Sequence, residues 1–148
     1  MSRPHLFLDI DGVLIGRPHP ESRQLCLAFH AETFLRFALK HFDCFWLSSL
    51  TQTGETEPAL EHLGIFAPAQ FIELALEVEA EPWIHCKTEA IAALAPRDFY
   101  WVDDAPTVTE RRWLRGRGQT DRLIQINTRK RPNGLLSAQG RLRSTLTS

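Results

Sequence analysis

No run in this chain approaches the ~20 consecutive apolar residues that a helix needs to cross a bilayer. Cysteine is scarce, because Cys26, Cys44 and Cys86 are odd in number and widely spaced. Such usage indicates reduced thiols and argues against a disulfide framework or a zinc knuckle. The N-terminus leads straight into an apolar run without the pattern of a signal peptide. We therefore expect a cytoplasmic protein with no membrane partner.

Length and composition are those of an ordinary soluble globular domain. The 148 residues can bury a real core, and 43% of them are hydrophobic and 24% charged. We expect residues 1–148 to form a single domain. The net charge of −1 is unevenly distributed: residues 1–96 carry 6 Lys or Arg against 13 Asp or Glu (−7), and residues 97–148 carry 11 against 5 (+6). Such asymmetry is typical either of a surface that faces a polyanion or of helix faces that differ in charge.

Strand and helix patterns alternate along the chain. Apolar runs predict strands at 6–8, 44–47, 98–102 and 123–126, and helical spacings or helix boundary signals predict helices at 21–41, 55–63, 87–94, 107–115 and 135–146. Residues 71–76 fit a strand, or a strand leading into a helix; residues 15–20 are predicted as a loop over the site, and the acidic stretch 73–81 as a solvated edge or loop. The alternation predicts an α/β fold with a doubly wound, mostly parallel sheet and helices on both faces.

The first predicted strand ends in two acids separated by one residue, Asp9 and Asp11, followed by Gly12. The carboxyl ends of strands are where open α/β sheets bind ligands. Two carboxylates this close repel each other, and a divalent cation relieves the repulsion. The stretch therefore predicts a Mg²⁺ site beside a carboxylate nucleophile. The alternative is a polar turn without a ligand, since Asp-Gly is a common turn pair.

Polar residues at other strand ends complete a set. Ser48 follows the second strand, Lys87 begins a helix, and Asp103 and Asp104 follow a later strand. Because the carboxyl ends of parallel strands lie along one edge, we expect these residues to converge with the first acid pair. Each also has a plain structural interpretation: the serine or the acid pair caps the next segment, and the lysine is exposed in a first helical turn. Ser49 is the alternative hydroxyl.

These residues resemble the motifs of the haloacid-dehalogenase-like (HAD) hydrolase superfamily over nearly the whole chain. The four motifs correspond to Phe7–Leu14, Ser48, Lys87, and Trp101-Val102-Asp103-Asp104. More narrowly, Trp46–Ser49, the second acid pair and Gly134-Leu135-Leu136 look like the small HAD domains found in RNA-repair proteins. The resemblance implies a Rossmann-like HAD core. The intervals between the motifs leave no room for a full cap domain.

The resemblance also implies a Mg²⁺-dependent phosphohydrolase that acts on a phosphomonoester. Asp9 would attack phosphorus to give an aspartyl phosphate, and Asp11 would protonate the leaving oxygen and then activate water. Ser48 or Ser49, together with Lys87, would hold the phosphoryl oxygens. The implied Mg²⁺ ligands are Asp9, Asp11 through its main-chain carbonyl, Asp103 and Asp104.

Arg129, Lys130 and Arg131 follow the last predicted strand and so belong to the same edge of the sheet. An open site flanked by basic residues suits a substrate with more than one phosphate. We therefore expect the substrate to be the phosphate end of a nucleic acid, with RNA favoured over DNA. The alternative is that these basic side chains only solvate a loop and bind no substrate. Two other functions remain open: a receiver-like phosphoacceptor domain, and a non-catalytic module that binds a phosphorylated partner.

Overall fold

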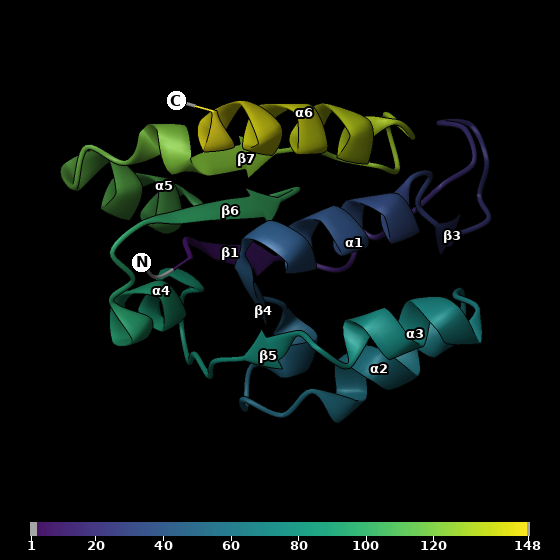
Figure 1. The fold of residues 1–148 in the computed structure, drawn as a ribbon, viewed down its shortest axis with the longest axis horizontal. Helices are drawn as coiled ribbons and strands as arrows, with labels where there is room; N and C mark the ends of the chain where they lie inside the picture. Colours follow the sequence, from purple (N-terminus) through teal and green to yellow (C-terminus); the bar gives the residue numbers. More distant parts are fainter. Residues whose placement is uncertain (1–2, 148) are drawn as a thin grey trace.

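The computed structural model describes residues 3–147, and a parallel sheet forms its centre (Figure 1). The strands are β1 (His5–Leu8), β4 (Asp43–Trp46), β5 (Glu79–Ala80), β6 (Phe99–Asp103) and β7 (Leu123–Gln125). Their spatial order is β5-β4-β1-β6-β7, and every pairing within this sheet is parallel. From β1 the chain first adds strands on one side and then returns to add them on the other. The predicted doubly wound topology is confirmed, and its switch point lies between β1 and β6.

Helices cover both faces of the sheet, as predicted. The helices are α1 (Ala31–His41), α2 (Glu57–Gly64), α3 (Ala69–Ala75), α4 (Thr88–Leu94), α5 (Val108–Gly116) and α6 (Gly134–Leu146), with short 3-10 turns at Ser49–Thr51 and Thr120–Arg122. Alternate residues of β1 face opposite sides. Leu6 and Leu8 join a core with α1, α2, α3 and α6, whereas Phe7 packs with α4 and α5. Within the described residues, no helix is long and apolar enough to span a bilayer.

The predicted helix 21–41 is wrong over its first ten residues, because α1 begins only at Ala31. The segment before it forms a hairpin in which β2 (Ile15–Gly16), part of the predicted loop, pairs antiparallel with β3 (Cys26–Leu27). The Ala28 amide donates to Leu14 O at 2.7 Å. The backbone of this segment therefore pairs with the turn after β1 and with β2, and does not form helical hydrogen bonds. The left-handed φ of 68° at His30 then separates the hairpin from the helix.

The interpretation of residues 71–76 as a strand is also wrong, because residues 71–75 belong to α3 and Leu76 caps its end. Phe71 and Ala75 are the two buried residues of this helix, and Glu73 midway between them is exposed. A strand would place all three side chains on one face, whereas a helix places only the first and the last together. The strand of this region is β5, which lies inside the acidic stretch predicted as an edge or loop. Two residues at the edge of a sheet carry too little apolar pattern to be recognised.

Candidate functional site

The turn after β1 brings two acids to the carboxyl edge of the sheet. Asp9 is buried, and its Oδ1 accepts from the Ile10 amide at 2.8 Å. Gly12 has a φ of +78°, and a side-chain carbon there would overlap the Asp104 carboxylate. The Gly12 carbonyl accepts from the Thr128 amide at 2.8 Å, which ties this turn to the segment after β7. Glycine is therefore required for backbone conformation and for the close approach of Asp104.

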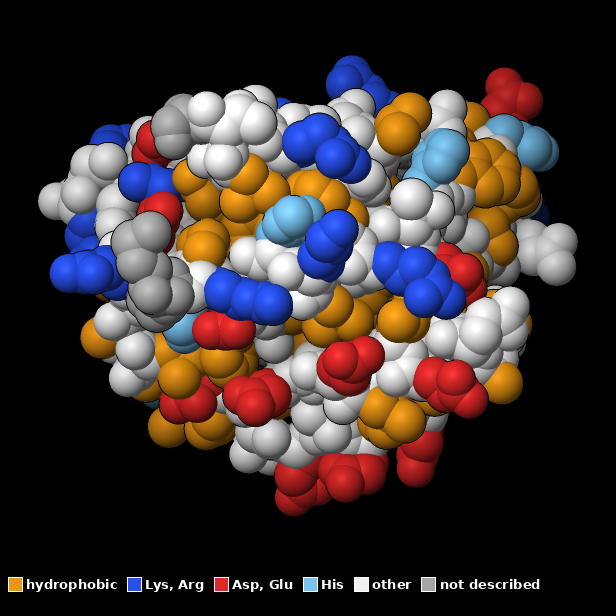
Figure 2. Space-filling model, in the orientation of Figure 1, with side chains coloured by type: hydrophobic (Ala, Val, Ile, Leu, Met, Phe, Trp, Pro, Cys, Tyr) orange, Lys and Arg blue, Asp and Glu red, His pale blue; other side chains and the backbone are white. Residues whose placement is uncertain are grey.

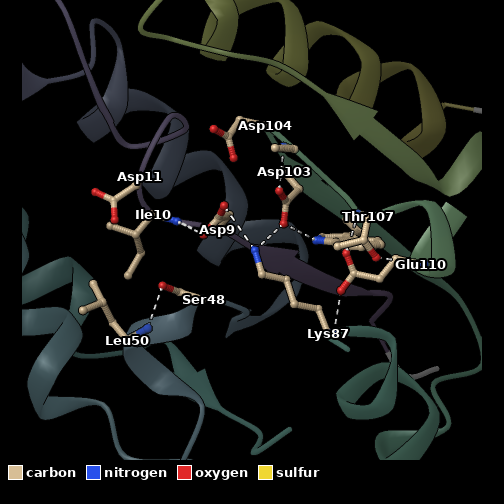
Figure 3. A network of polar contacts seen from close by, with 12 residues as sticks. Asp9, Ile10, Asp11, Ser48, Leu50, Lys87, Asp103, Asp104, Thr107 and Glu110 are labelled. Atoms are coloured by element: carbon tan, nitrogen blue, oxygen red, sulfur yellow. Dashed lines mark hydrogen bonds and ion pairs between the residues drawn. The ribbon is translucent and has the colours of Figure 1, made fainter. Parts of the chain in front are cut away.

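Lys87 links the first acid pair to the second (Figure 3). Its Nζ lies 2.6 Å from Asp103 Oδ2 and 3.2 Å from Asp9 Oδ2. Asp103 is 1% exposed, and the Trp101 Nε1 donates to the same oxygen at 3.1 Å. Carboxylate oxygens of Asp9, Asp103 and Asp104 all lie within 4.8 Å of one another. The structure thus brings together four of the predicted residues from β1, β6 and the start of α4.

Electrostatics at this cluster disfavour the ionised carboxylates. Burial and the neighbouring Asp103 hold the pKa of Asp9 well above its usual range, against the opposing effect of Lys87. Burial likewise raises the pKa of Asp104. Burial alone would lower the pKa of Lys87, but Asp9 and Asp103 outweigh it and the pKa lies above its ordinary value. An ammonium that stays charged therefore neutralises part of the cluster.

The donor set fits a divalent cation. When its three carboxylates and the ammonium are all ionised, the cluster carries a charge of −2, which a bound cation would offset. Carboxylate oxygens are the ligands that Mg²⁺ prefers in proteins. Asp9, Asp103 and Asp104 would hold the ion through side chains. The Asp11 carboxylate is not among the oxygens that lie within this distance of one another, which is compatible with a predicted contact through its main-chain carbonyl.

Ser48 lies at the end of β4, facing the same region in Figure 3. It is 2% exposed, and its hydroxyl oxygen accepts from the Leu50 amide at 3.1 Å. The predicted capping role is thus present. The hydroxyl hydrogen remains free to donate to a ligand, because a serine can accept and donate at once. Ser49 is exposed and begins the 3-10 turn.

Asp11 points away from the buried cluster and is partly exposed, with 41% of its side chain accessible. His62 of α2 approaches it, with 2.9 Å between Nε2 and Asp11 Oδ1. Arg129 Nη2 lies 3.9 Å from the same oxygen. His62 is not among the site residues that the sequence predicts. No spacing rule links two residues 51 positions apart, so only the fold reveals this pair.

Glu110 is a second residue that the sequence reasoning missed. Its Oε2 accepts from the Lys87 amide at 2.7 Å, and the side chain is almost fully buried. Its Oε1 accepts from the Thr107 amide, while the Thr107 hydroxyl accepts from the Glu110 amide, a capping box at the start of α5. The Thr-x-x-Glu spacing is a visible sequence signal for this cap. Its link to Lys87 is not visible in the sequence.

The basic residues after β7 separate into two groups. Arg129 reaches toward Asp11, as described. Lys130 and Arg131 instead line a cavity beside Asp104 and are exposed. None of the three contacts the Asp9–Lys87–Asp103 ion pairs. The structure therefore places Arg129 beside Asp11, the predicted general acid, and places Lys130 and Arg131 at the periphery of the site.

Comparison with known proteins found no matching family model, no matching curated protein and no matching solved structure. The resemblance to the HAD superfamily stays a prediction from the sequence motifs. The chemistry of the site is therefore inferred from its own residues: a buried carboxylate beside a lysine, three clustered acid side chains, and a partly exposed acid held by a histidine.

Proposed function

We propose that this protein is a Mg²⁺-dependent phosphohydrolase that cleaves phosphomonoesters through an aspartyl phosphate on Asp9. The observation that carries the proposal is the buried ion-pair cluster of Asp9, Lys87 and Asp103 at the carboxyl edge, with Asp11 two residues from the nucleophile. A buried anion held beside an ammonium is suited to attack a phosphorus whose oxygens that ammonium also contacts. The resemblance to HAD hydrolases supports the same assignment.

The first half-reaction transfers the phosphoryl group to the protein. A carboxylate oxygen of Asp9 forms a bond to phosphorus as the bond between phosphorus and the leaving oxygen breaks. Asp11, protonated at this stage, gives its proton to the leaving oxygen. In the second half-reaction Asp11 takes a proton from water, the water oxygen bonds to phosphorus, and the Asp9–phosphorus bond breaks. Inorganic phosphate leaves and both acids return to their starting states.

Two further side chains hold the group in transfer. Lys87 supplies positive charge, and Ser48 has a hydroxyl hydrogen to donate, so both can bind phosphoryl oxygens. A bound Mg²⁺, held by Asp9, Asp103 and Asp104, would supply charge neutralisation for the phosphoryl oxygens. Asp104 reaches the cluster only because Gly12 leaves room for its carboxylate.

The proposal is tested by hydrolysis of p-nitrophenyl phosphate. Activity should require Mg²⁺ and disappear in chelator and in the Asp9→Asn protein. Asp43→Asn is the matched control, because Asp43 is an exposed acid at the opposite edge of the sheet and should leave turnover unchanged. Full activity in chelator, or in the Asp9→Asn protein, would refute the mechanism.

The two alternative functions give different results in the same assay. A receiver-like phosphoacceptor domain would accumulate phosphate on Asp9 without steady release, and a non-catalytic module would bind phosphate and release none. Asp11→Asn separates catalysis from binding: turnover should fall on the order of 10²-fold while Mg²⁺ still binds, because general acid–base catalysis is lost. Turnover near wild type would show that Asp11 is not the acid.

A further inference from the structure

A cavity of about 570 Å³ opens beside Asp104 at the carboxyl edge of the sheet. It lies between the segment after β7 and the start of α6. The lining residues are Asp104, Gln125, Ile126, Asn127, Lys130, Arg131, Asn133, Gly134 and Ser137. Asp104 is also one of the three clustered carboxylates, so the cavity adjoins the proposed reaction centre at this residue. Its volume is that of a small-molecule site and exceeds what one phosphate needs.

The walls of this cavity differ in how their side chains are used. Gln125 is fixed, because it donates to Asp104 O at 3.0 Å and accepts from Arg111. The Asn127 side chain accepts from the Arg129 amide at 3.0 Å. Four polar side chains make no hydrogen bond or ion pair anywhere in residues 3–147: Lys130, Arg131, Asn133 and Ser137. Two cations, an amide and a hydroxyl are thus available to a ligand.

The character of the available groups selects an anion. An unpaired lysine and arginine beside amide and hydroxyl donors recognise phosphate oxygens. Asp104 is the only acid among the lining residues, and the proposed cation engages it. Another cavity, of about 390 Å³ at the amino edge of the sheet, is instead lined by three acids, Asp43, Glu77 and Glu79, and a single arginine. In Figure 2 Lys and Arg lie mostly over α1, α5 and α6, and Asp and Glu gather mostly at the bottom of the view, on the side of α2, α3 and β5.

We infer that this cavity binds a second phosphate group of the substrate, on the leaving-group side of the phosphate that reacts at Asp9. The inference rests on the proposed function and adds a substrate class: phosphomonoesters that carry another phosphate. Lys130 and Arg131 bind the second phosphate, and Asn133 and Ser137 donate to it. The remaining volume, floored by Ile126, holds the organic part that joins the two phosphates.

The test compares three substrates: adenosine 5′-monophosphate, adenosine 3′,5′-bisphosphate, and a dinucleotide with a 5′-phosphate. The measured quantity is the ratio of kcat/KM for each two-phosphate substrate to that for the monophosphate, which cancels differences in the active fraction. In the wild type this ratio should be on the order of tenfold or more, since it reports charge-assisted hydrogen bonds. It should shrink with added salt.

Two double variants locate the effect. Lys130→Ala with Arg131→Ala should bring the ratio to near one. Arg112→Ala with Arg141→Ala removes the same charge from exposed positions outside the cavity and should keep the wild-type ratio. A dinucleotide preferred over the bisphosphate identifies a nucleic-acid end as the source of the second phosphate, and the reverse order identifies a small nucleotide.

A wild-type ratio near one, or a ratio that survives Lys130→Ala with Arg131→Ala, would overturn the inference while leaving the phosphatase proposal intact. If none of the three substrates is hydrolysed, calorimetry tests the cavity by comparing the affinity for the bisphosphate with that for the monophosphate. The phosphatase proposal fails if p-nitrophenyl phosphate is not hydrolysed either. Equal affinities in the calorimetric comparison would overturn the inference, and a preference that the cavity variant abolishes would support it.

Discussion

At the scale of single residues, the surroundings of the proposed nucleophile, Asp9, disfavour its ionised form although an ammonium group lies beside it. Lys87 lies 3.2 Å from the Asp9 carboxylate, yet burial and Asp103 keep the pKa of Asp9 raised. A raised pKa in the folded state means that folding favours the protonated acid. The corresponding stability is fully present below the ordinary value of 3.8 and is lost as the pH rises through the folded pKa.

Asp9→Asn should therefore stabilise the metal-free protein at neutral pH. The amide keeps the acceptor for the Ile10 amide, and Lys87 keeps its contact with Asp103. A gain on the order of 1 kcal/mol in the free energy of unfolding is expected, as is common when an active-site strain is removed. Denaturant unfolding in chelator at pH 7 and pH 4 measures it, with a smaller gain at pH 4. A variant less stable than wild type at pH 7 would contradict this account of the charges.

His62 should act by positioning Asp11. Its Nε2 lies 2.9 Å from Asp11 Oδ1, and its ring packs against Phe66. His62→Ala should lower kcat on the order of tenfold with little change in KM, because the acid loses its orientation but the phosphate contacts remain. His62→Gln, which places an amide donor near the same point, should recover part of the loss. His85→Ala, at an exposed position, is the control; a purely structural role for His62 would give no rescue by glutamine.

At the scale of elements, the start of α5 holds the start of α4. Glu110 completes the cap of its own helix and accepts from the Lys87 amide at 2.7 Å. Glu110→Gln removes one of the two carboxylate acceptors, so we expect a loss of 1–3 kcal/mol or so in stability and a lower kcat as Lys87 shifts. Thr107→Ala removes the other half of the cap and leaves the contact with Lys87, so it should cost stability of about 1 kcal/mol with a smaller effect on kcat. Equal losses of kcat in both variants would show that Glu110 does not affect turnover through its contact with Lys87.

The same elements show what the sequence could and could not predict. The runs that become β1, β4, β6 and β7 were recognisable, because buried parallel strands are short and continuously apolar. Their ends then placed Asp9, Ser48 and Asp103 at one edge without any knowledge of contacts. The hairpin of β2 and β3 was not recognisable, since two-residue strands have no period and residues 21–30 continue the apolar spacing of α1.

Contacts between side chains of different elements could not be predicted from the sequence, for a different reason. The pairing of His62 with Asp11 depends on how α2 packs over the turn after β1, and the link from Glu110 to Lys87 depends on how α5 packs beside α4. Tertiary packing sets both, and neither residue type nor spacing encodes it. The cavity beside Asp104 is a similar case, because Lys130 and Asn133 face it only once α6 is placed.

At the scale of the whole molecule, the distribution of charge matches the position of the site. The first 96 residues carry the acid excess and contribute Asp9 and Lys87 to the cluster, and the last 52 contribute Asp103, Asp104 and the basic residues beside them. The two parts meet where the order of the sheet reverses, between β1 and β6. Asp104, at the end of β6, contacts the turn of β1 at Gly12. A ligand bound there would join segments that are far apart in the chain, so it should stabilise the fold as a unit.

Mg²⁺ should therefore raise the melting temperature of the whole protein in one cooperative transition. Binding to the folded state alone adds a few kcal/mol at saturation, or on the order of 5 °C for a chain of this size. The rise should be large at pH 7 and small at pH 4, because protons compete for carboxylates whose pKa values are raised. Asp103→Asn should abolish the shift, and Asp43→Asn should retain it. Identical melting curves in Mg²⁺ and in chelator would rule out a cation at this cluster, and with it the charge balance on which the assignment of Asp9 depends.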